Sequence, residues 1–271
     1  MAPFTLYTLL GLGIPTFAVI DLAFRNADGH ATLSNVHTIV HGTYLVGFEN
    51  SLLLAAISAV VPGILGLVLA YAVATSRSNL LRRLVATASG VLANFGGINL
   101  TFMFIATLGS TGVLTGWLAA IGLDPWQHGF NLYNFWGVAL VYLYFQIPLM
   151  VLVVTPALAG LRPSWREAAE NLGASSTSYW RTVGIPVLLP SVLGGMLLLF
   201  GSAFAAYATA ETLTAGTVTL VPIQIGAVLN GNVIAGQENI GYALGLGMLV
   251  VLTVTMCLYG LVRRRASRWL R

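Results

Sequence analysis

Six long apolar segments constrain this chain more than any other feature of its sequence. Each is close to the roughly 20 residues that a helix needs to cross the hydrocarbon core of a bilayer. The stretches between them are polar or rich in proline and glycine. The sequence therefore predicts six membrane-spanning helices, with bounds near 4–24, 49–74, 84–109, 135–160, 187–210 and 239–262.

The composition favours a membrane protein without a separate soluble domain. Of the 271 residues, 57% are hydrophobic and 7% are charged, whereas soluble domains carry roughly 25% charged residues. We therefore expect an all-α polytopic protein in which residues 1–271 form a single transmembrane domain. No basic stretch precedes the first apolar segment, so a cleaved signal peptide is not expected.

Several functional classes are excluded by residue usage. All twelve basic residues are arginine, and a P-loop requires a lysine that reaches the nucleotide phosphates. The chain is therefore not expected to hydrolyse ATP by that route. Cys257 is the one cysteine, which excludes an intrachain disulfide and a cysteine cluster for metal. We expect no cofactor, no metal and no nucleic-acid partner for this chain.

The arginines fall almost entirely in alternate loops, and basic residues favour cytoplasmic loops. Arg25 alone lies on the opposite side. The distribution predicts that both termini and the loop between spans four and five are cytoplasmic. The other eleven arginines lie between spans two and three, between spans four and five, or after span six: Arg77, Arg82, Arg83, Arg162, Arg166, Arg181, Arg263, Arg264, Arg265, Arg268 and Arg271.

The loop 161–186 between spans four and five reads as a helix-turn-helix. Ser164 and Glu167 fit a capping box, which predicts that Ser164 begins the first helix. Glu167 and Glu170 would then lie near its start, where the helix dipole favours anions. Gly173 stands where a residue in the left-handed conformation ends a helix.

A second short helix is expected after this turn. Ser175 or Ser176 is a good N-cap for it. Pro186 follows within about three turns, and proline interrupts a helix. The sequence therefore predicts that this second helix ends at Pro186, where the next apolar segment begins.

At these residues the chain resembles a known family, the inner-membrane permease subunits of binding-protein-dependent ABC importers. Their cytoplasmic loop carries E-A-A, a glycine after three residues, nine further residues and I-x-L-P. Here Glu167-Ala168-Ala169 precedes Gly173, and Val183-Gly184-Ile185-Pro186 fills the last part. Val183 and Ile185 depart conservatively from the usual isoleucine and leucine. The number, order and spacing of the spans are also similar to this family.

The resemblance implies a bacterial inner-membrane protein with three kinds of partner. These are a cytoplasmic ABC ATPase dimer that binds ATP and Mg²⁺, a second permease subunit that is commonly a different chain, and an extracytoplasmic substrate-binding protein. The chain itself would be non-catalytic. The residues expected to couple it to the ATPase are Arg166, Glu167, Ala168, Ala169, Glu170, Gly173, Arg181 and Pro186.

Polar residues within the apolar segments are candidates for the substrate pathway. Such groups are costly in hydrocarbon and usually face a bundle interior or a watery cavity. Hydrogen bonding between helices explains each of them equally well. The overall layout of the chain is most similar to that of permeases of the spermidine/putrescine type, so a polyamine-like solute is the first expectation. The candidates are Asn94, Asn99, Gln146, Tyr207 and Glu211.

Three other groups of residues have simpler interpretations. Asp21 lies one helical turn before Arg25, which predicts an ion pair. The four histidines all fall in outward loops, and the i, i+4 pair His37 and His41 has no evident third metal ligand. Gly241 and Gly245 form a G-x-x-x-G pattern, and Ser191 with Gly195 has the same spacing; both indicate close helix packing.

Two rival classes remain open at this point. A secondary transporter that works without an ATPase would be expected to carry internal repeats and broken helices. A membrane enzyme would need a clustered catalytic set near one bilayer face. The acids here are scattered over different loops, which disfavours the enzyme.

Overall fold

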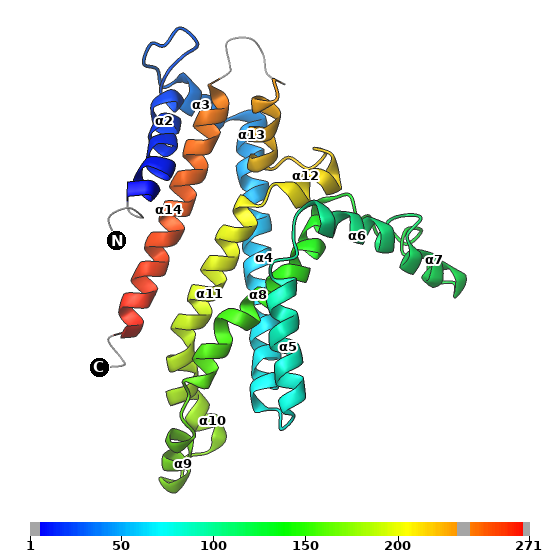
Figure 1. Ribbon diagram of the computed structural model, residues 1–271, viewed down its shortest axis with the longest axis vertical. Coiled ribbons are helices and arrows are strands. Elements are labelled where there is room, and N and C mark those ends of the chain that lie inside the picture. Colours follow the sequence, from blue (N-terminus) through cyan, green and yellow to red (C-terminus); the bar gives the residue numbers. More distant parts are fainter. Residues whose placement is uncertain (1–5, 232–238, 268–271) are drawn as a thin grey trace. The chain divides into compact units, whose positions relative to one another are not determined.

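The computed structural model describes residues 6–231 and 239–267, and within these residues every regular element is a helix (Figure 1). A single isolated β-bridge joins Arg25 to Ala31. The expected all-α architecture is confirmed. Six helical segments are long and apolar enough to cross a membrane: Leu6–Ala23, Gly42–Thr75, Ile98–Ala120, Phe135–Ala159, Ser176–Ala205 and Ile240–Val262.

The chain divides into two compact units, and the first comprises Met1–Leu53 and Gly216–Val254. Its core is small and wholly apolar, and it includes Ala23, Ile39, Val221 and Leu244. The elements of this unit are η1 (Leu9–Gly13, a π-helical stretch), α2 (Ile14–Ala23), α3 (Ser34–Ile39), α13 (Val221–Leu229) and the first parts of α4 (Gly42–Thr75) and α14 (Ile240–Ser267).

Polar side chains tie the loops of the first unit to its helices. The Asn35 and Asn239 side chains each donate to the Arg25 carbonyl oxygen, at 2.7 and 2.9 Å. The Ser51 hydroxyl accepts the backbone N–H of Val221 at 2.9 Å, which satisfies an orphan donor at the start of α13. The predicted ion pair between Asp21 and Arg25 is confirmed, with a shortest N···O distance of 2.8 Å.

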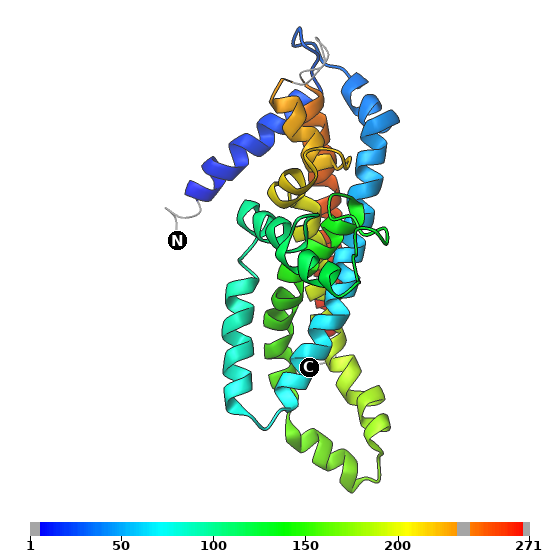
Figure 2. The same ribbon diagram turned by 90° about the vertical axis from the view of Figure 1, so that its right-hand side faces the viewer.

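The second unit comprises Leu54–Ala215 and Thr255–Arg271. The second half of α4 runs beside α5, α8 and α11, as both ribbon views show (Figures 1 and 2). The elements of this unit, besides the ends of α4 and α14, are α5 (Asn79–Leu92), α6 (Ile98–Leu108), α7 (Val113–Ala120), α8 (Phe135–Ala159), α9 (Pro163–Asn171), α10 (Ser176–Tyr179), η2 (Trp180–Gly184, π-helical), α11 (Ile185–Ala205) and α12 (Ala208–Thr214).

Helix α8 is the centre of the second unit. Met150, Val151, Val154 and Leu158 on α8 are buried together with Ala59 and Ala70 of α4 and with Leu188, Val192 and Leu199 of α11. Small residues allow this contact. A Cβ added at Gly66 would lie 2.6 Å from the Met150 Cβ, and one at Gly195 would lie 2.8 Å from the Met150 sulfur. The packing role expected for Gly195 is confirmed.

The glycine pair in α14 also lies at close contacts. A Cβ at Gly241 would lie 2.8 Å from Val228 of α13, and one at Gly245 would lie 3.3 Å from Val19 of α2. All these residues belong to the first unit. The G-x-x-x-G pattern therefore packs helices of this chain against each other, as expected.

The predicted third span, 84–109, is wrong as one continuous helix. Helix α5 ends at Leu92 and α6 begins at Ile98. Gly97 has a φ of 75°, which a helix interior cannot contain, and the Asn94 side chain turns back onto the Gly90 carbonyl oxygen at 2.9 Å. At 1.5 Å per residue, α5 is only about 21 Å long. The segment that is long and apolar enough to cross a membrane is Ile98–Ala120, which contains α6 and α7.

The bounds of span five also differ from the expected 187–210. The helical segment begins at Ser176 and ends at Ala205, before the extended backbone of Ala206. Glu211 consequently belongs to the separate helix α12 rather than to the span, and Tyr207 is the N-cap residue of α12.

We predict that Gly66→Ala destabilises the second unit by about 1–3 kcal/mol, because the added methyl group overpacks the contact between α4 and α8. Gly90→Ala is the matched control, since a Cβ there meets nothing within 4 Å. It should be neutral or slightly stabilising. Denaturant unfolding of the purified chain in one detergent measures both, and equal midpoints for the two variants would contradict this account of the contact.

Candidate functional site

None of the nine residues of helix α9 is buried, and only Trp165 and Ala169 are partly covered. An isolated helix of this length is only marginally stable in water, so local interactions must stabilise it. Pro163 occupies the first helical position, where its fixed φ suits a helix and its missing N–H costs nothing. Helices α9 and α10 lie at the lower end of the second unit in Figure 1.

The expected capping box at Ser164 is wrong. Arg162 is the N-cap, with extended backbone and no side-chain cap, and Ser164 lies inside the helix. Proline at the first position sets the start two residues earlier than Ser164 as N-cap would. The first turn consequently contains no acid. The expectation that Glu167 and Glu170 lie near the helix start is therefore also wrong, and Glu170 lies in the last turn.

The position of Glu170 is compensated by an ion pair within the helix. A carboxylate in the last turn opposes the helix dipole. The Arg166 Nε donates to the Glu170 Oε1 at 2.9 Å, in the favourable i, i+4 spacing. This hydrogen bond and the charge of Glu170 raise the pKa of Arg166. Both side chains are more than half exposed, so solvent screens the pair and it contributes little to stability.

Gly173 ends α9 as the sequence predicts. Its φ is 78°, the left-handed conformation that favours glycine. The Gly173 N–H donates to the Glu170 carbonyl oxygen and the Ala174 N–H donates to the Ala169 carbonyl oxygen, both at 2.9 Å. These two bonds form a Schellman motif, which satisfies the last carbonyl groups of the helix.

The second helix begins at the expected cap but does not end where expected. The Ser175 hydroxyl accepts the Ser178 N–H at 3.2 Å, which selects Ser175 over Ser176 as N-cap. Pro186 then lies in the first turn of α11, and the chain is helical from Ser176 to Ala205. The prediction that Pro186 ends the helix is therefore wrong.

A π-helical stretch explains how the helix continues past the proline. In η2 the Ile185 N–H donates to the Trp180 carbonyl oxygen, a bond across five residues instead of four. This wider spacing of hydrogen bonds removes the need for a bond from Pro186, which has no backbone N–H to donate. Helix α10 is consequently the first turn of the rod that continues as α11.

Trp180 packs the start of this rod against the rest of the unit. Its ring lies edge-on to Tyr71 of α4, with centroids 5.3 Å apart. A Cβ at Gly184 would lie 2.4 Å from the Trp180 ring, so glycine is needed for this ring to lie flat on η2. Trp180 therefore joins the start of this rod to α4 through a direct ring contact.

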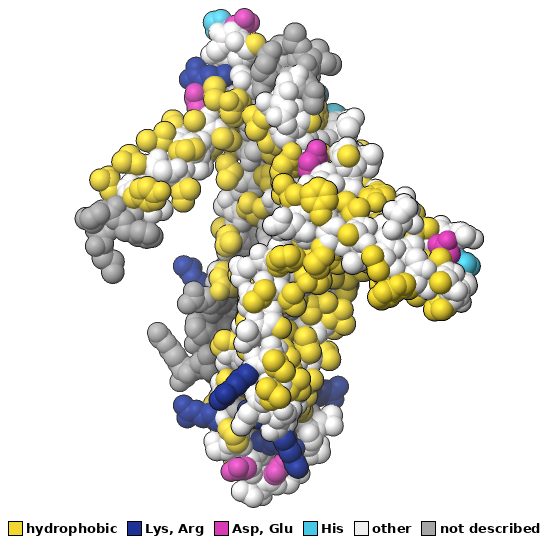
Figure 3. All heavy atoms as spheres, turned by 45° about the vertical axis from the view of Figure 1, so that its right-hand side comes forward, with side chains coloured by type: hydrophobic (Ala, Val, Ile, Leu, Met, Phe, Trp, Pro, Cys, Tyr) yellow, Lys and Arg dark blue, Asp and Glu magenta, His cyan; other side chains and the backbone are white. Residues whose placement is uncertain are grey.

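The exposed face of α9 combines charge with apolar surface. Glu167, Ala168 and Leu172 are exposed, and the Leu172 side chain is 88% exposed. Most of the Lys and Arg side chains in Figure 3 gather at the lower end of the view, around two acidic groups. Arg181 is exposed on η2. Such a surface is suited to a protein partner.

Two of the five polar pathway candidates have unpartnered polar atoms inside the second unit. Gln146 on α8 is completely buried, and neither polar atom of its side chain has a hydrogen-bond partner among the described residues. The Glu211 Oε2 of α12 is likewise buried without a partner there. Asn94, Asn99 and Tyr207 are exposed. The Glu211 backbone N–H donates to the Tyr207 carbonyl oxygen at 2.9 Å, but among the described residues no side chain of these three hydrogen-bonds to the side chain of Gln146 or Glu211.

Three residues that hold α12 in place were not among the candidates. The Thr209 hydroxyl accepts the Gly97 N–H at 3.0 Å, and the Thr101 hydroxyl donates to the Thr209 carbonyl oxygen at 3.2 Å. The Tyr142 hydroxyl donates to the Ala206 carbonyl oxygen at 3.0 Å. These bonds satisfy the backbone where α5 and α11 end. The signals in the sequence are that Thr101 and Thr209 are polar residues within predicted spans and that Tyr142 lies one turn before Gln146.

Within the described residues no group of three metal-ligating side chains is brought together. The rings of His37 and His41 stack at 4.3 Å, and the His41 Nδ1 lies 2.7 Å from the His37 carbonyl oxygen. Both side chains are accounted for by these local contacts.

Comparison with protein families gives one match, which covers most of the chain. Residues 63–268 match the model of the binding-protein-dependent transport system inner membrane component. The matched region contains α9, α10, Gln146 and Glu211.

Curated relatives are similar at low identity. The sulfate transport system permease protein CysT of Escherichia coli K12 is 27% identical over 60% of this chain and 56% of its own length. The spermidine/putrescine transport system permease protein PotB of Haemophilus influenzae is 31% identical over 49% of this chain and 43% of its own length. The chain thus spans about half the length of these relatives.

Solved structures share the fold. A crystal structure of a bacterial ABC transporter involved in the import of the acidic polysaccharide alginate has a TM-score of 0.73, at 18% identity, over 98% of this chain and 93% of that chain. A second crystal structure, of the bacterial alginate ABC transporter in complex with a pentasaccharide-bound periplasmic protein, has a TM-score of 0.75.

We predict that Gly173→Val loosens α9 without preventing membrane insertion. A β-branched residue is strained at positive φ and costs roughly 1–2 kcal/mol, which is large for a nine-residue helix. Hydrogen exchange should become faster in peptides covering α9 and unchanged in those covering α8. Gly29→Val is the control, because Gly29 has a φ of 82° in a loop of the first unit. Unchanged exchange in α9 would contradict the structural role of Gly173.

Proposed function

The chain belongs to the family of binding-protein-dependent transport system inner membrane components, and from this premise we propose that it is a permease subunit of an ABC importer. The observation that carries this proposal is α9, an exposed helix with the E-A-A and glycine pattern, joined through one turn to a rod that is long and apolar enough to cross a membrane. A helix so exposed needs a partner to stabilise it.

We propose that this partner is a cytoplasmic ATPase. Glu167 makes polar contacts in a groove of the ATPase, Ala168 and Ala169 allow close approach, and Leu172 covers the apolar edge. Glu167 has no hydrogen bond or ion pair to another described residue, which leaves its carboxylate available. The permease chain is non-catalytic in this proposal. It contains no lysine, and ATP and Mg²⁺ are bound by the ATPase.

Transmission follows from the continuity of the helix. Closure of the ATPase moves α9, and the Schellman turn at Gly173 holds α9 at a fixed angle to α10. Because α10, η2 and α11 form one rod, the displacement reaches the membrane without being absorbed by a flexible loop. A difference in ATPase affinity between two states of the permease then shifts their populations.

We predict that Glu167→Arg abolishes retention of the ATPase during purification, because it reverses the one acid on α9 that has no internal pair. Asp28→Arg is the control, with the same charge change in an exposed loop of the first unit. The ATPase subunit retained by each variant is measured after co-expression. Equal retention by Glu167→Arg and the unaltered chain would remove α9 as the docking element and would favour a secondary transporter.

The arginine distribution supports an orientation in which α9 and both termini are cytoplasmic. We predict that a cysteine at position 176, in a Cys257→Ser background, reacts with a membrane-impermeant maleimide only after cells are opened. His30→Cys should react in intact cells, since His30 lies in an exposed loop of the first unit. Labelling of Ser176→Cys in intact cells would reverse the orientation.

For the substrate we propose a small cationic amine of the polyamine type. The curated relatives include both sulfate and spermidine/putrescine permeases, so the choice depends on the charge of the interior. The buried, unpartnered carboxylate oxygen of Glu211 attracts an amine and repels sulfate. The Gln146 amide offers neutral hydrogen bonds in the same unit. Asn94, Asn99 and Tyr207 extend the proposed pathway.

Two further partners complete the proposed importer. An extracytoplasmic binding protein delivers the solute, and a second permease subunit forms the other half of the pathway. The complex of a structurally similar transporter with a periplasmic protein supports the first of these.

We predict that Glu211→Gln lowers uptake of radiolabelled putrescine at least tenfold in cells that depend on this transporter. The change keeps the side-chain shape and removes the charge. Glu49→Gln, in an exposed position of α4, is the control and should transport normally. The proposal of a cationic substrate fails if Glu211→Gln transports putrescine normally, or if the unaltered chain supports sulfate uptake instead.

A further inference from the structure

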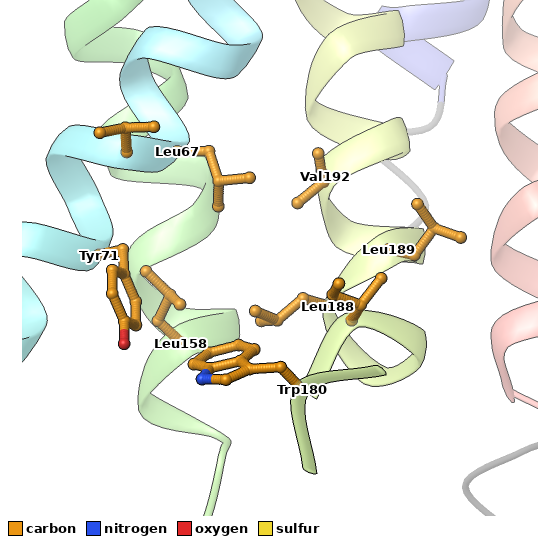
Figure 4. A pocket seen from close by; sticks show the side chains of 9 residues that line it. Leu67, Tyr71, Leu158, Trp180, Leu188, Leu189 and Val192 are labelled. Carbon is orange, nitrogen blue, oxygen red and sulfur yellow. The ribbon is translucent and has the colours of Figure 1, made fainter. Parts of the chain in front are cut away.

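An apolar groove lies in the second unit at the level of Trp180 (Figure 4). It has a volume of about 390 Å³ and is lined by nine residues of α4, α8, η2 and α11. Seven of these are aliphatic, and the other two are Tyr71 and Trp180. In Figure 4, Leu67 and Val192 lie at one end of the groove, and Tyr71 and Trp180 lie at the other.

The groove is open on one side. Its lining residues Val68, Ile185 and Leu189 are 61%, 53% and 47% exposed. These residues belong to helices long and apolar enough to span a bilayer. Hydrocarbon rather than water fills an open apolar groove within a bilayer, because water molecules there would lose hydrogen bonds.

The polar edge of the groove faces the arginine-rich end of the unit. Tyrosine and tryptophan, with an apolar body and a polar tip, are typical of the boundary between hydrocarbon and headgroups. Arg166 lies on α9, which adjoins α10 at this end of the unit (Figure 1).

A second arginine adjoins the same edge. Arg181 directly follows Trp180 and is exposed on η2. It has no hydrogen bond or ion pair to any other residue that the structure describes. The groove thus combines an apolar wall with cationic groups at one end only. A polypeptide helix could fill the apolar part, but it would not by itself compensate the arginines, whereas an anionic amphiphile matches both features.

We propose that the groove binds one acyl chain of an anionic phospholipid, whose phosphate lies beside Arg181 and Arg166. The lipid comes from the leaflet on the α9 side, which is the inner leaflet if the proposed function and its orientation hold. Basic sites between membrane helices on the cytoplasmic side are a recognised class of anionic lipid site.

Quenching of Trp180 fluorescence tests this directly. The full chain is reconstituted into phosphatidylcholine vesicles that contain an equal minor fraction of dibrominated phosphatidylglycerol or of dibrominated phosphatidylcholine. The Trp180 signal is the difference between the unaltered chain and Trp180→Phe. We expect stronger quenching by the phosphatidylglycerol, with a preference on the order of fivefold for each arginine that contacts the phosphate.

Matched variants separate the headgroup from the groove. Arg181→Gln should reduce the preference for phosphatidylglycerol about fivefold, whereas Arg83→Gln, exposed on α5 and outside the groove, should leave it unchanged. Val68→Phe narrows the groove and should lower quenching by both lipids. Val61→Phe, at an exposed position two turns earlier on α4, should not.

Two results would overturn the proposal. Equal quenching by the two brominated lipids would show that the arginines select no headgroup. Absence of quenching by either would show that protein covers the groove, for example a second copy of this chain. Native mass spectrometry of the unaltered chain provides a second measurement that depends on no substitution, since retained phosphatidylglycerol must exceed retained phosphatidylcholine.

The outcome is independent of the importer proposal. No ATPase or solute is present in the vesicles, so loss of ATPase retention in Glu167→Arg and selective quenching of Trp180 are separate results. Selective quenching, combined with no retention of an ATPase by the unaltered chain, would support the lipid site and contradict the importer. ATPase retention without selective quenching would support the importer and contradict the lipid site.

Discussion

Backbone hydrogen bonding is the constraint on which the rest of this structure depends. In hydrocarbon every N–H and C=O group needs a partner within the protein, so each interruption of a helix requires a specific replacement. Thr209 accepts the free N–H of Gly97, and Tyr142 donates to the carbonyl oxygen of Ala206. Where the chain leaves the spans, Gly173 and Ser175 serve the same purpose. Specific hydrogen bonds thus satisfy backbone groups at these breaks in the helices.

The two candidate functional regions, α9 and the buried polar residues, lie in opposite environments. Helix α9 exposes its surface because nothing within the described chain covers it, and its short length makes a binding partner valuable. Gln146 and Glu211 instead hide polar atoms from solvent without pairing them. Buried unpaired groups are costly, so a protein retains them where a ligand or water completes their bonds. The rod from α10 to α11 connects the exposed surface with the interior.

Sequence patterns predicted the features that depend on neighbours along the chain. Gly173, Ser175 and the pair of Asp21 with Arg25 were predicted because each acts within one or two turns. Ser164 was assigned wrongly because Pro163 competes for the same helix start. The third span was misplaced because hydropathy does not register the turn at Gly97. Contacts such as Thr209 with Gly97 join residues more than a hundred positions apart, and no local pattern encodes them. The polar pathway and the partners stay predictions.

The π-helical stretch from Trp180 to Gly184 has a consequence for how this region tolerates change in length. A π-bulge contains one residue more than the α-helix it replaces, and each residue of an α-helix turns the next by about 100°. Because the wider turn accommodates the extra residue, the helical segments on either side of η2 keep nearly the phase of an uninterrupted helix. Removing one residue from η2 should therefore rotate α9 about the axis of α11 far less than removing one from an α-helical part of the same rod, where each residue accounts for about 100°.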